Sequence, residues 1–261
     1  MLEIAVDAGV ARVTLSRPDV RNAFNAELIA QLHAAFEKLG ADERVRVIVL
    51  AGAGKAFCGG ADISWMRASL ELTYEANVAD AAAMSRMFRA IDRTPKLVIG
   101  RVQGAALGGG AGLAAVCDVV VAADDALFGF TETKLGILPA VISPFVLAKI
   151  GHSHARALAL TGERFAARRA LAIGLVHELA SPVALDDAVA RIAGEIASAS
   201  PSAVARTKAL FATVRERTYD ATLDLTASAI AEQRTSPEGQ DGLRAFLEKR
   251  RPAWHGATQP H

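Results

Sequence analysis

The sequence predicts an α/β fold in which strands and helices alternate along most of the chain, before a final region of helices alone. First, short runs rich in β-branched residues, such as residues 45–50 and 97–102, are typical of buried strands. Second, apolar residues recur at helical spacing in longer segments, for example in residues 25–39. Third, these two strands each lead into a Gly-rich turn. Such alternation of strand, loop and helix indicates an α/β protein.

The elements up to residue 122 follow from these patterns. A strand at residues 10–16 is expected to end before Pro18. The first helix is expected to begin after Asn25, a favourable N-cap, and to end at Gly40. The remaining expected elements are strands at 45–50, 97–102 and 118–122, a long helix at 74–91, and a short helix after the second Gly-rich turn.

Beyond about residue 143 amphipathic helical stretches follow one another and strand signals become few. We therefore divide the chain into a strand–loop–helix core at residues 1–195 and a helical C-terminal region at residues 196–261. No low-complexity linker separates the two regions. The helical stretches expected in this half are 155–160, 166–173, 185–197 and 202–217.

Composition excludes several functional classes. The net charge of +1 provides no global attraction for nucleic acid or an anionic membrane, so neither partner is expected. The apolar runs are shorter than the roughly 18 residues that a membrane span needs. Cys58 and Cys117 form no CxxC pair and the six His form no cluster, so no metal site is expected. The N-terminal residues lack the features of a signal peptide, which favours a cytoplasmic protein.

Two Gly-rich turns follow strands, at residues 55–63 and 103–113. Glycine lets the backbone approach a ligand closely, and the first amides of a helix have no partner within it. If the two turns converged, their amides would form an oxyanion hole that stabilises developing negative charge. The alternative is that the glycines only allow tight turns and close packing. Neither turn fits the dinucleotide-binding fingerprint or the phosphate-binding loop of nucleotide-dependent enzymes.

An ordered set of short motifs makes the sequence resemble the enoyl-CoA hydratase/isomerase (crotonase) superfamily across nearly its whole length. Each motif alone is weak, but the ordered set is specific. The motifs are Arg17-Pro18 followed by Asn22-Ala23, Ala56-Phe57-Cys58-Gly59-Gly60-Ala61-Asp62-Ile63, Leu107-Gly108-Gly109-Gly110, Thr131-Glu132-Thr133-Lys134-Leu135-Gly136, Leu160-Thr161-Gly162-Glu163, Gly174-Leu175-Val176 and Phe246-Leu247-Glu248-Lys249-Arg250-Arg251-Pro252.

The resemblance implies a crotonase-like spiral of β-β-α units with a helical C-terminal region, assembled as a homotrimer or a dimer of trimers. It also implies an acyl-CoA substrate whose thioester oxygen binds the amides of Ala61 and Gly109. Coenzyme A arrives as part of the substrate, so no further cofactor is expected. Lys249 and Arg250 would reach the CoA phosphates, in one chain or between subunits, or else form a solvated helix end. The residues implied in CoA binding are Arg21, Ala23, Lys55, Ala56, Ala61, Asp62, Ile63, Gly109, Lys249 and Arg250.

One catalytic glutamate of the family has a match here and the other does not. Glu132 matches the glutamate that moves a proton at the α-carbon, and the apolar residues before it are expected to raise its pKa by desolvation. Gly112 stands at the position of the glutamate that activates water. Asp62 is expected to cap a helix instead of reacting. Asp118, Asp124, Asp125 and Lys134 are candidate auxiliaries, and His152 with His154 is expected to mark the entry to a helix.

The segment 136–146, which contains Pro-Ala-Val-Ile-Ser-Pro, together with Gly112 resembles bacterial methylglutaconyl-CoA hydratases. That likeness implies a branched 2-enoyl-CoA with a distal carboxylate, which would itself help to position the water. Hydration is therefore the first expectation. An isomerase that shuttles a proton with Glu132 alone is the second. A non-catalytic acyl-CoA-binding protein is the third, and is excluded if Glu132 acts on the α-carbon of a bound thioester.

Overall fold

A six-stranded sheet forms the centre of the computed structural model, which describes residues 1–256. Its order is β1-β2-β3-β4-β6-β9, with an antiparallel pair at one edge and parallel pairing beyond it. A smaller sheet has the order β5-β7-β8. The strands are β1 (Leu2–Asp7), β2 (Val10–Leu15), β3 (Val47–Gly52), β4 (Leu97–Val102), β5 (Ala105–Leu107), β6 (Val119–Ala123), β7 (Leu127–Gly129), β8 (Arg164–Ala166) and β9 (Glu178–Ala180).

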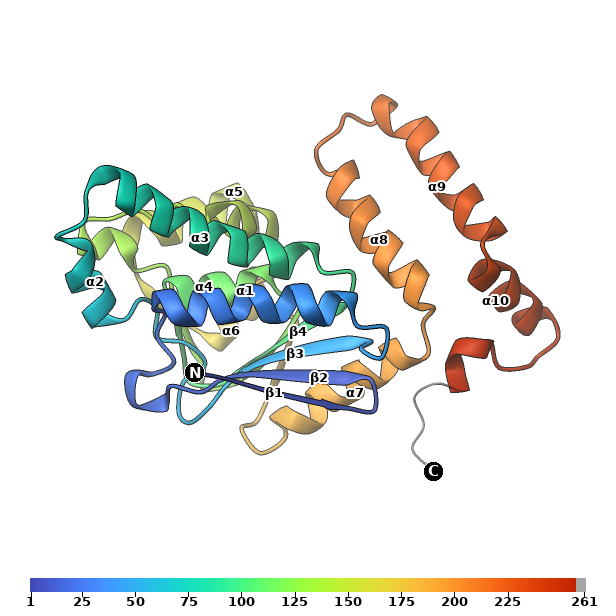
Figure 1. Cartoon of the computed structure of the whole chain (residues 1–261), viewed down its shortest axis with the longest axis horizontal. Helices are drawn as coiled ribbons and strands as arrows, with labels where there is room; N and C mark the ends of the chain where they lie inside the picture. Colours follow the sequence, from blue (N-terminus) through green and yellow to red (C-terminus); the bar gives the residue numbers. More distant parts are fainter. Residues whose placement is uncertain (257–261) are drawn as a thin grey trace.

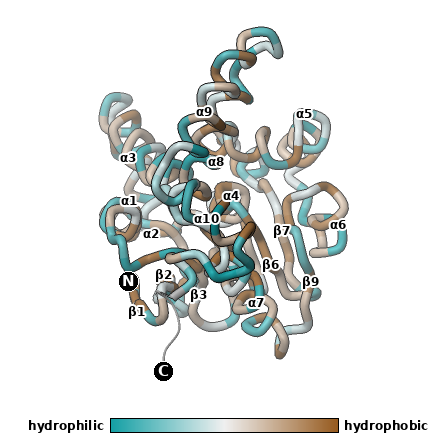
Figure 2. The backbone as a smooth tube through the Cα atoms, turned by 90° about the vertical axis from the view of Figure 1, so that its right-hand side faces the viewer, coloured by the Kyte–Doolittle hydropathy of each residue, from teal (hydrophilic) through white to brown (hydrophobic). Residues whose placement is uncertain are grey.

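Helices cover both faces of the main sheet, which confirms the predicted α/β class. Helices α1 (Ala26–Ala41) and α3 (Tyr74–Arg93) lie side by side above the strands in Figure 1, and α7 (Leu185–Ala197) packs below against β4 and β6. Apolar residues concentrate along the inner strands, as the brown tube near β6 shows in Figure 2. The other helices of the core are α2 (Ile63–Ser69), α4 (Gly109–Val116), α5 (Ser143–Thr161) and α6 (Ala167–Ala172).

Helix α1 shows how sequence pattern becomes structure. The Leu28 amide donates to the Asn25 side chain at 2.9 Å, which confirms the predicted N-cap. The expected end at Gly40 is wrong, because the helix continues to Ala41. Gly40 instead allows close packing: a Cβ there would lie 3.0 Å from the Thr94 hydroxyl oxygen.

The strands at 10–16, 45–50, 97–102 and 118–122 are all present, with small shifts at their ends. The first strand, β1, gave no signal because it is a mostly exposed edge strand. The helix expected at 166–173 begins one residue late, since Ala166 ends β8. Helix α5 contains the stretch 155–160, and its helical geometry breaks at Gly151, so His152 and His154 lie where the helix restarts, as predicted.

The C-terminal region is helical, as predicted, and extends away from the main sheet (Figure 1). It contains α8 (Pro201–Val214), α9 (Leu223–Thr235) and α10 (Pro237–Leu247), and many of its large apolar side chains are exposed. Helix α7 spans residue 195, and the division into two domains stays a prediction. Within residues 1–256, no helix combines the length and apolar character needed to cross a membrane.

Candidate active site

The two Gly-rich turns meet at the ends of β3 and β4. The Phe57 amide donates to the Gln103 carbonyl at 2.8 Å, and the Cys58 amide donates to the Ala105 carbonyl at 3.0 Å. The Leu107 amide then donates back to the Cys58 carbonyl at 3.0 Å. These alternating bonds hold the turns in one parallel bridge. Two segments about 50 residues apart in the sequence therefore form one backbone-built structure.

Glycine is required at two points of this contact. Gly104 has a φ of +58°, and a Cβ there would lie 1.9 Å from the Lys55 carbonyl oxygen. A Cβ at Gly110 would lie 2.2 Å from the Cys58 carbonyl oxygen. Both distances are too short for any side chain, so these glycines permit close packing. The glycines therefore allow the close packing of the two Gly-rich turns, and this packing is what brings the two turns together.

Two backbone amides remain free beside the contact. Phe24 exchanges bonds with the residues flanking Ala61, because its amide donates to the Gly60 carbonyl and its carbonyl accepts from the Asp62 amide. Gly109 is the first residue of α4, where an amide has no partner within the helix. Among residues 1–256, neither the Ala61 nor the Gly109 amide has a hydrogen-bond acceptor. Both therefore remain able to bind a ligand oxygen.

An ion pair fixes the loop that carries Ala61. The Arg17 guanidinium donates to the Asp62 carboxylate at 2.7 Å and to the Ala23 carbonyl at 2.5 Å. The hydrogen bond from Arg17 lowers the pKa of Asp62. The other Asp62 oxygen accepts from the Ser64 amide at 2.8 Å, which confirms the predicted N-cap at α2. Sequence reasoning did not assign this role to Arg17, although the Arg17-Pro18 motif marked its position.

Asn22 joins the predicted CoA-binding segments. It is fully buried, and its side-chain amide donates to the carbonyls of Ala53 and Ala56 at 2.9 and 2.8 Å. The neighbouring Arg21 carbonyl accepts from the Gly59 amide at 2.7 Å. The structure thus brings segments 21–23 and 55–63 together, with the side chains of Arg21, Lys55 and Ile63 exposed to solvent.

The carboxyl group of Glu132 lies against Gly108, the residue before the free Gly109 amide. Glu132 begins a short 3₁₀ helix (Glu132–Leu135), and a Cβ on Gly108 would lie 3.2 Å from its Oε1 atom. Its Oε2 atom is buried and has no hydrogen-bond partner among the described residues. Burial raises the pKa of Glu132, in the expected direction and for the expected cause. A buried carboxyl group without a partner is costly, which makes it a candidate for a functional role.

Gly112 faces an apolar wall. A Cβ there would lie 2.3 Å from Ile142 Cγ2 and 3.2 Å from Phe88 Cζ. Ile142 is 2% exposed, and the Phe88 ring stacks on Phe145 at a centroid distance of 5.4 Å. The space in which a larger side chain at position 112 would stand is therefore filled by hydrocarbon.

The other candidate auxiliaries do not join Glu132. Asp118 precedes β6, at the opposite end of the parallel strands from the Gly-rich turns, and its carboxylate accepts from the Lys208 ammonium at 2.7 Å. Asp124 and Asp125 are exposed in the turn after β6. Lys134 follows Glu132 but packs near Gly162.

Lys249 and Arg250 lie away from this site within one chain. They follow α10, at the opposite end of the molecule from α2 (Figure 1). Arg250 forms ion pairs of 2.7 Å with both Asp241 and Glu248. A contact between these residues and a ligand at Glu132 would therefore have to come from a second chain, and it stays a prediction.

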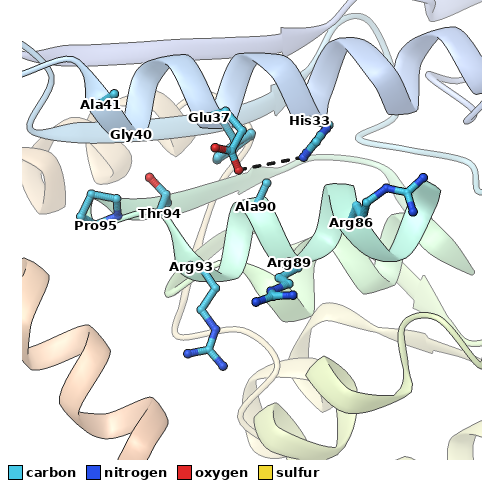
Figure 3. Close-up of a pocket in the computed structure, with 11 residues that line it drawn as sticks. His33, Glu37, Gly40, Ala41, Arg86, Arg89, Ala90, Arg93, Thr94 and Pro95 are labelled. Atoms are coloured by element: carbon cyan, nitrogen blue, oxygen red, sulfur yellow. Dashed lines mark ion pairs between the residues drawn. The ribbon is translucent and has the colours of Figure 1, made fainter. Parts of the chain in front are cut away.

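A separate hollow of about 560 Å³ lies between α1 and α3. His33 and Glu37 form one side, with an ion pair of 3.9 Å, and Arg86, Arg89 and Arg93 form the other (Figure 3). It contains no residue of the predicted acyl-CoA site, so this hollow is distinct from the candidate site at Glu132.

Comparison with known proteins agrees with this fold. The sequence model of a family described as enoyl-CoA hydratase/isomerase matches residues 5–257. The crystal structure of an enoyl-CoA hydratase from Shewanella pealeana is 38% identical, with a TM-score of 0.94, over 97% of this chain and 95% of that chain. Pseudomonas aeruginosa AtuE is 40% identical, with a TM-score of 0.94, over 97% and 99% of the two chains. The short-chain-enoyl-CoA hydratase of Clostridium acetobutylicum is 33% identical, over 93% of this chain and 92% of that protein.

Proposed function

The chain belongs to the enoyl-CoA hydratase/isomerase family and has the crotonase fold, and from this premise we propose that it adds water to a 2-enoyl-CoA. The observation that carries the proposal is the half-buried Glu132 beside Gly108, whose Oε2 atom is buried and has no partner among the described residues, next to the free amide of Gly109. A carboxyl group able to exchange a proton and an amide able to bind an oxygen are thus close together. No cofactor beyond the coenzyme A of the substrate enters the scheme.

The amides of Ala61 and Gly109 would bind the thioester oxygen. As water adds to C3 of the substrate, the electrons of the double bond move through C2 to this oxygen and form an enolate. The N-terminus of α4 adds a favourable field for that negative charge. The water loses one proton to solvent, and the Glu132 carboxylic acid delivers its proton to C2. The resulting carboxylate then regains a proton from solvent before the next turnover. The raised pKa of Glu132 increases the fraction of carboxylic acid available to protonate C2.

We further propose that the substrate is a branched 2-enoyl-CoA with a distal carboxylate, such as 3-methylglutaconyl-CoA. The resemblance of segment 136–146 to methylglutaconyl-CoA hydratases supports this choice. The Ile142 contact supports it as well, because no second carboxylate fits at Gly112 to hold the water. The substrate's own carboxylate would hold the water instead. An analogue without that carboxylate should then be hydrated much more slowly by the unmodified protein.

Isomerisation is the second candidate, and the same observation favours it. Moving a double bond between the 3 and 2 positions needs one base that takes a proton from one carbon and returns it to another. Glu132 alone can do this, and Ile142 excludes a second protein base at position 112. The enolate and its two amides would be the same in both reactions.

The assembly and location are also proposals. Lys249 and Arg250 follow α10, at the opposite end of the chain from α2 (Figure 1), and this placement supports a trimer in which a neighbouring chain contacts the CoA phosphates. Cys58 and Cys117 are both free and buried, which supports a cytoplasmic location, where thiols stay reduced.

The test follows the absorbance of the conjugated enoyl thioester with purified protein. Crotonyl-CoA, 3-methylglutaconyl-CoA and a 3-enoyl-CoA are compared for the unmodified protein, Glu132→Gln and Glu37→Gln. Glu37 is an exposed residue of α1 and serves as the matched control. Glu132→Gln should lower the rate about 100-fold or more, whereas Glu37→Gln should leave it unchanged.

Each outcome selects one function. A Glu132-dependent loss of absorbance with a 2-enoyl substrate supports hydration. A gain with the 3-enoyl substrate alone makes the protein an isomerase. Tight binding of acyl-CoA with no change in any absorbance would leave a non-catalytic binding protein and overturn the proposal.

A further inference from the structure

Ile142 lies between helix α4 and an apolar cavity. On one side its Cγ2 atom closes the face of α4 at Gly112, as the 2.3 Å distance from a Cβ there shows. On the other side Ile142 lines an apolar cavity of about 200 Å³ beside α5, together with Phe130, Pro139 and Val146. Ile142 is 2% exposed, so its side chain fills the position between them.

The face of α4 gives the direction in which an acyl chain would run. If the thioester oxygen binds the Gly109 amide, Gly112 lies about 4.5 Å farther along the helix axis, a distance of a few carbon–carbon bonds. The groups nearest this face are apolar: Phe24 and Met84 lie against Gly109, and Ile142 and Phe88 lie against Gly112. An alkyl group leaving the reacting carbons would meet Ile142.

We propose that Ile142 is a specificity-determining residue that limits the length of the acyl chain by separating the α4 face from the apolar cavity behind it. The inference rests on the proposed function, because it takes Gly109 as the anchor of the thioester. It deepens that function by naming the size class of the substrate. Short acyl groups fit in front of Ile142, and longer ones need the space behind it.

A smaller residue at 142 would open the cavity beside α5 toward the face of α4 at Gly112. The cavity wall is almost entirely hydrocarbon, so added methylene groups would enter an apolar environment. One methylene in such a pocket changes discrimination by about tenfold or more. Ile142→Ala should therefore raise the preference for an eight-carbon over a four-carbon acyl group by at least about tenfold.

The experiment compares the unmodified protein, Ile142→Ala and Val146→Ala. Val146 is also buried and lines the same cavity, but it is not among the atoms nearest to Gly112, so it is the matched control. Two ratios are measured: kcat/KM for trans-2-octenoyl-CoA over crotonyl-CoA, and the affinity for octanoyl-CoA over butyryl-CoA. Thermal unfolding confirms that each variant is folded.

The expected result is a shift of both ratios toward the longer chain in Ile142→Ala and a change of less than about twofold in Val146→Ala. An unchanged ratio in folded Ile142→Ala, or an equal shift in the control, would overturn the proposal. If Ile142→Ala does not fold, Ile142→Val must give a smaller shift in the same direction. Binding of the saturated thioesters needs no reaction, so it tests Ile142 even where a failed hydration assay has refuted the proposed function.

Discussion

At the scale of single residues, Glu132 combines properties that a structural carboxyl group rarely has. It is half-buried, its buried Oε2 atom has no partner among the described residues, and its pKa is raised by desolvation. In the folded protein the charged form is therefore less favourable than in the unfolded chain. Such an environment reduces stability, and it suits a group that exchanges protons with a ligand.

The effect of Glu132 on stability should depend on pH. Because its folded pKa lies above the ordinary value of 4.5, the unfolded chain loses this proton first as pH rises. The stability of the unmodified protein relative to Glu132→Gln should therefore be greatest below pH 4.5 and fall as pH rises through the folded pKa. Denaturant unfolding of both proteins between pH 4 and pH 8 measures this difference. An unmodified protein that gains stability relative to Glu132→Gln as pH rises would contradict the prediction.

The sequence could predict some site residues better than others. Glu132 and the Ala61 and Gly109 turns are predicted from the sequence because their motifs are local and their order along the chain is specific. The ion pair of Arg17 with Asp62 joins residues that lie 45 positions apart, and no local pattern indicates it. The contact between Gly112 and Ile142 was missed for the same reason, since it depends on how α4 packs against the start of α5.

At the scale of elements, α4 is a helix whose small residues allow other segments to pack closely. Gly110 contacts the Cys58 carbonyl, Gly109 contacts Phe24, and Gly112 contacts Ile142. Glycine inside a helix costs about 0.5–1 kcal/mol relative to alanine. Here that cost is offset by close approach on three sides, which holds the N-terminus of α4 against the first Gly-rich turn.

Gly112→Ala should therefore destabilise the protein, although alanine favours a helix. The new methyl group would overlap Ile142 and cost about 1–3 kcal/mol. In the double variant with Ile142→Ala the loss should be smaller than the sum of the single losses by about 0.5–3 kcal/mol. Gly194→Ala in α7 is the control, since open space surrounds that position, and it should be neutral or stabilising. Additive losses in denaturant unfolding would show that the two residues do not compete for space.

Prediction of the elements succeeded where a pattern was long enough. Strand β3 is a six-residue apolar run, β4 has four consecutive residues of mostly β-branched or apolar character before Arg101, and α1 repeats its buried residues over four turns. Strands β5, β7, β8 and β9 have only three residues each, too few to show a period. Their pairing also joins distant segments, as Leu127 pairs with Ala166. The smaller sheet that positions the Gly108 turn was therefore not predictable.

At the scale of the whole molecule, the C-terminal helices project away from the main sheet (Figure 1). Phe246 and Leu247 at the end of α10 are 82% and 78% exposed, and Phe211 on α8 is 67% exposed. Clustered large apolar side chains on a surface favour association. The same region carries Lys249 and Arg250, which one chain places far from Glu132.

Self-association through this region should be detectable and should affect substrate binding. The unmodified protein is expected to have three or six times the 27.3 kDa mass of one chain in light scattering after size-exclusion chromatography. Phe246→Asp combined with Leu247→Asp should lower that mass, because each new carboxylate would have to lose its water in an apolar contact.

If Lys249 and Arg250 of one chain serve the site of the next, this variant should also raise KM for acyl-CoA more than it lowers kcat. Val183→Asp is the control, since Val183 is 92% exposed in the loop before α7, and it should change neither mass nor KM. A double variant with the full assembled mass would place the contact between chains elsewhere. An unmodified protein that stays at 27.3 kDa would exclude a trimer and leave the basic residues of the C-terminal region without a substrate to contact.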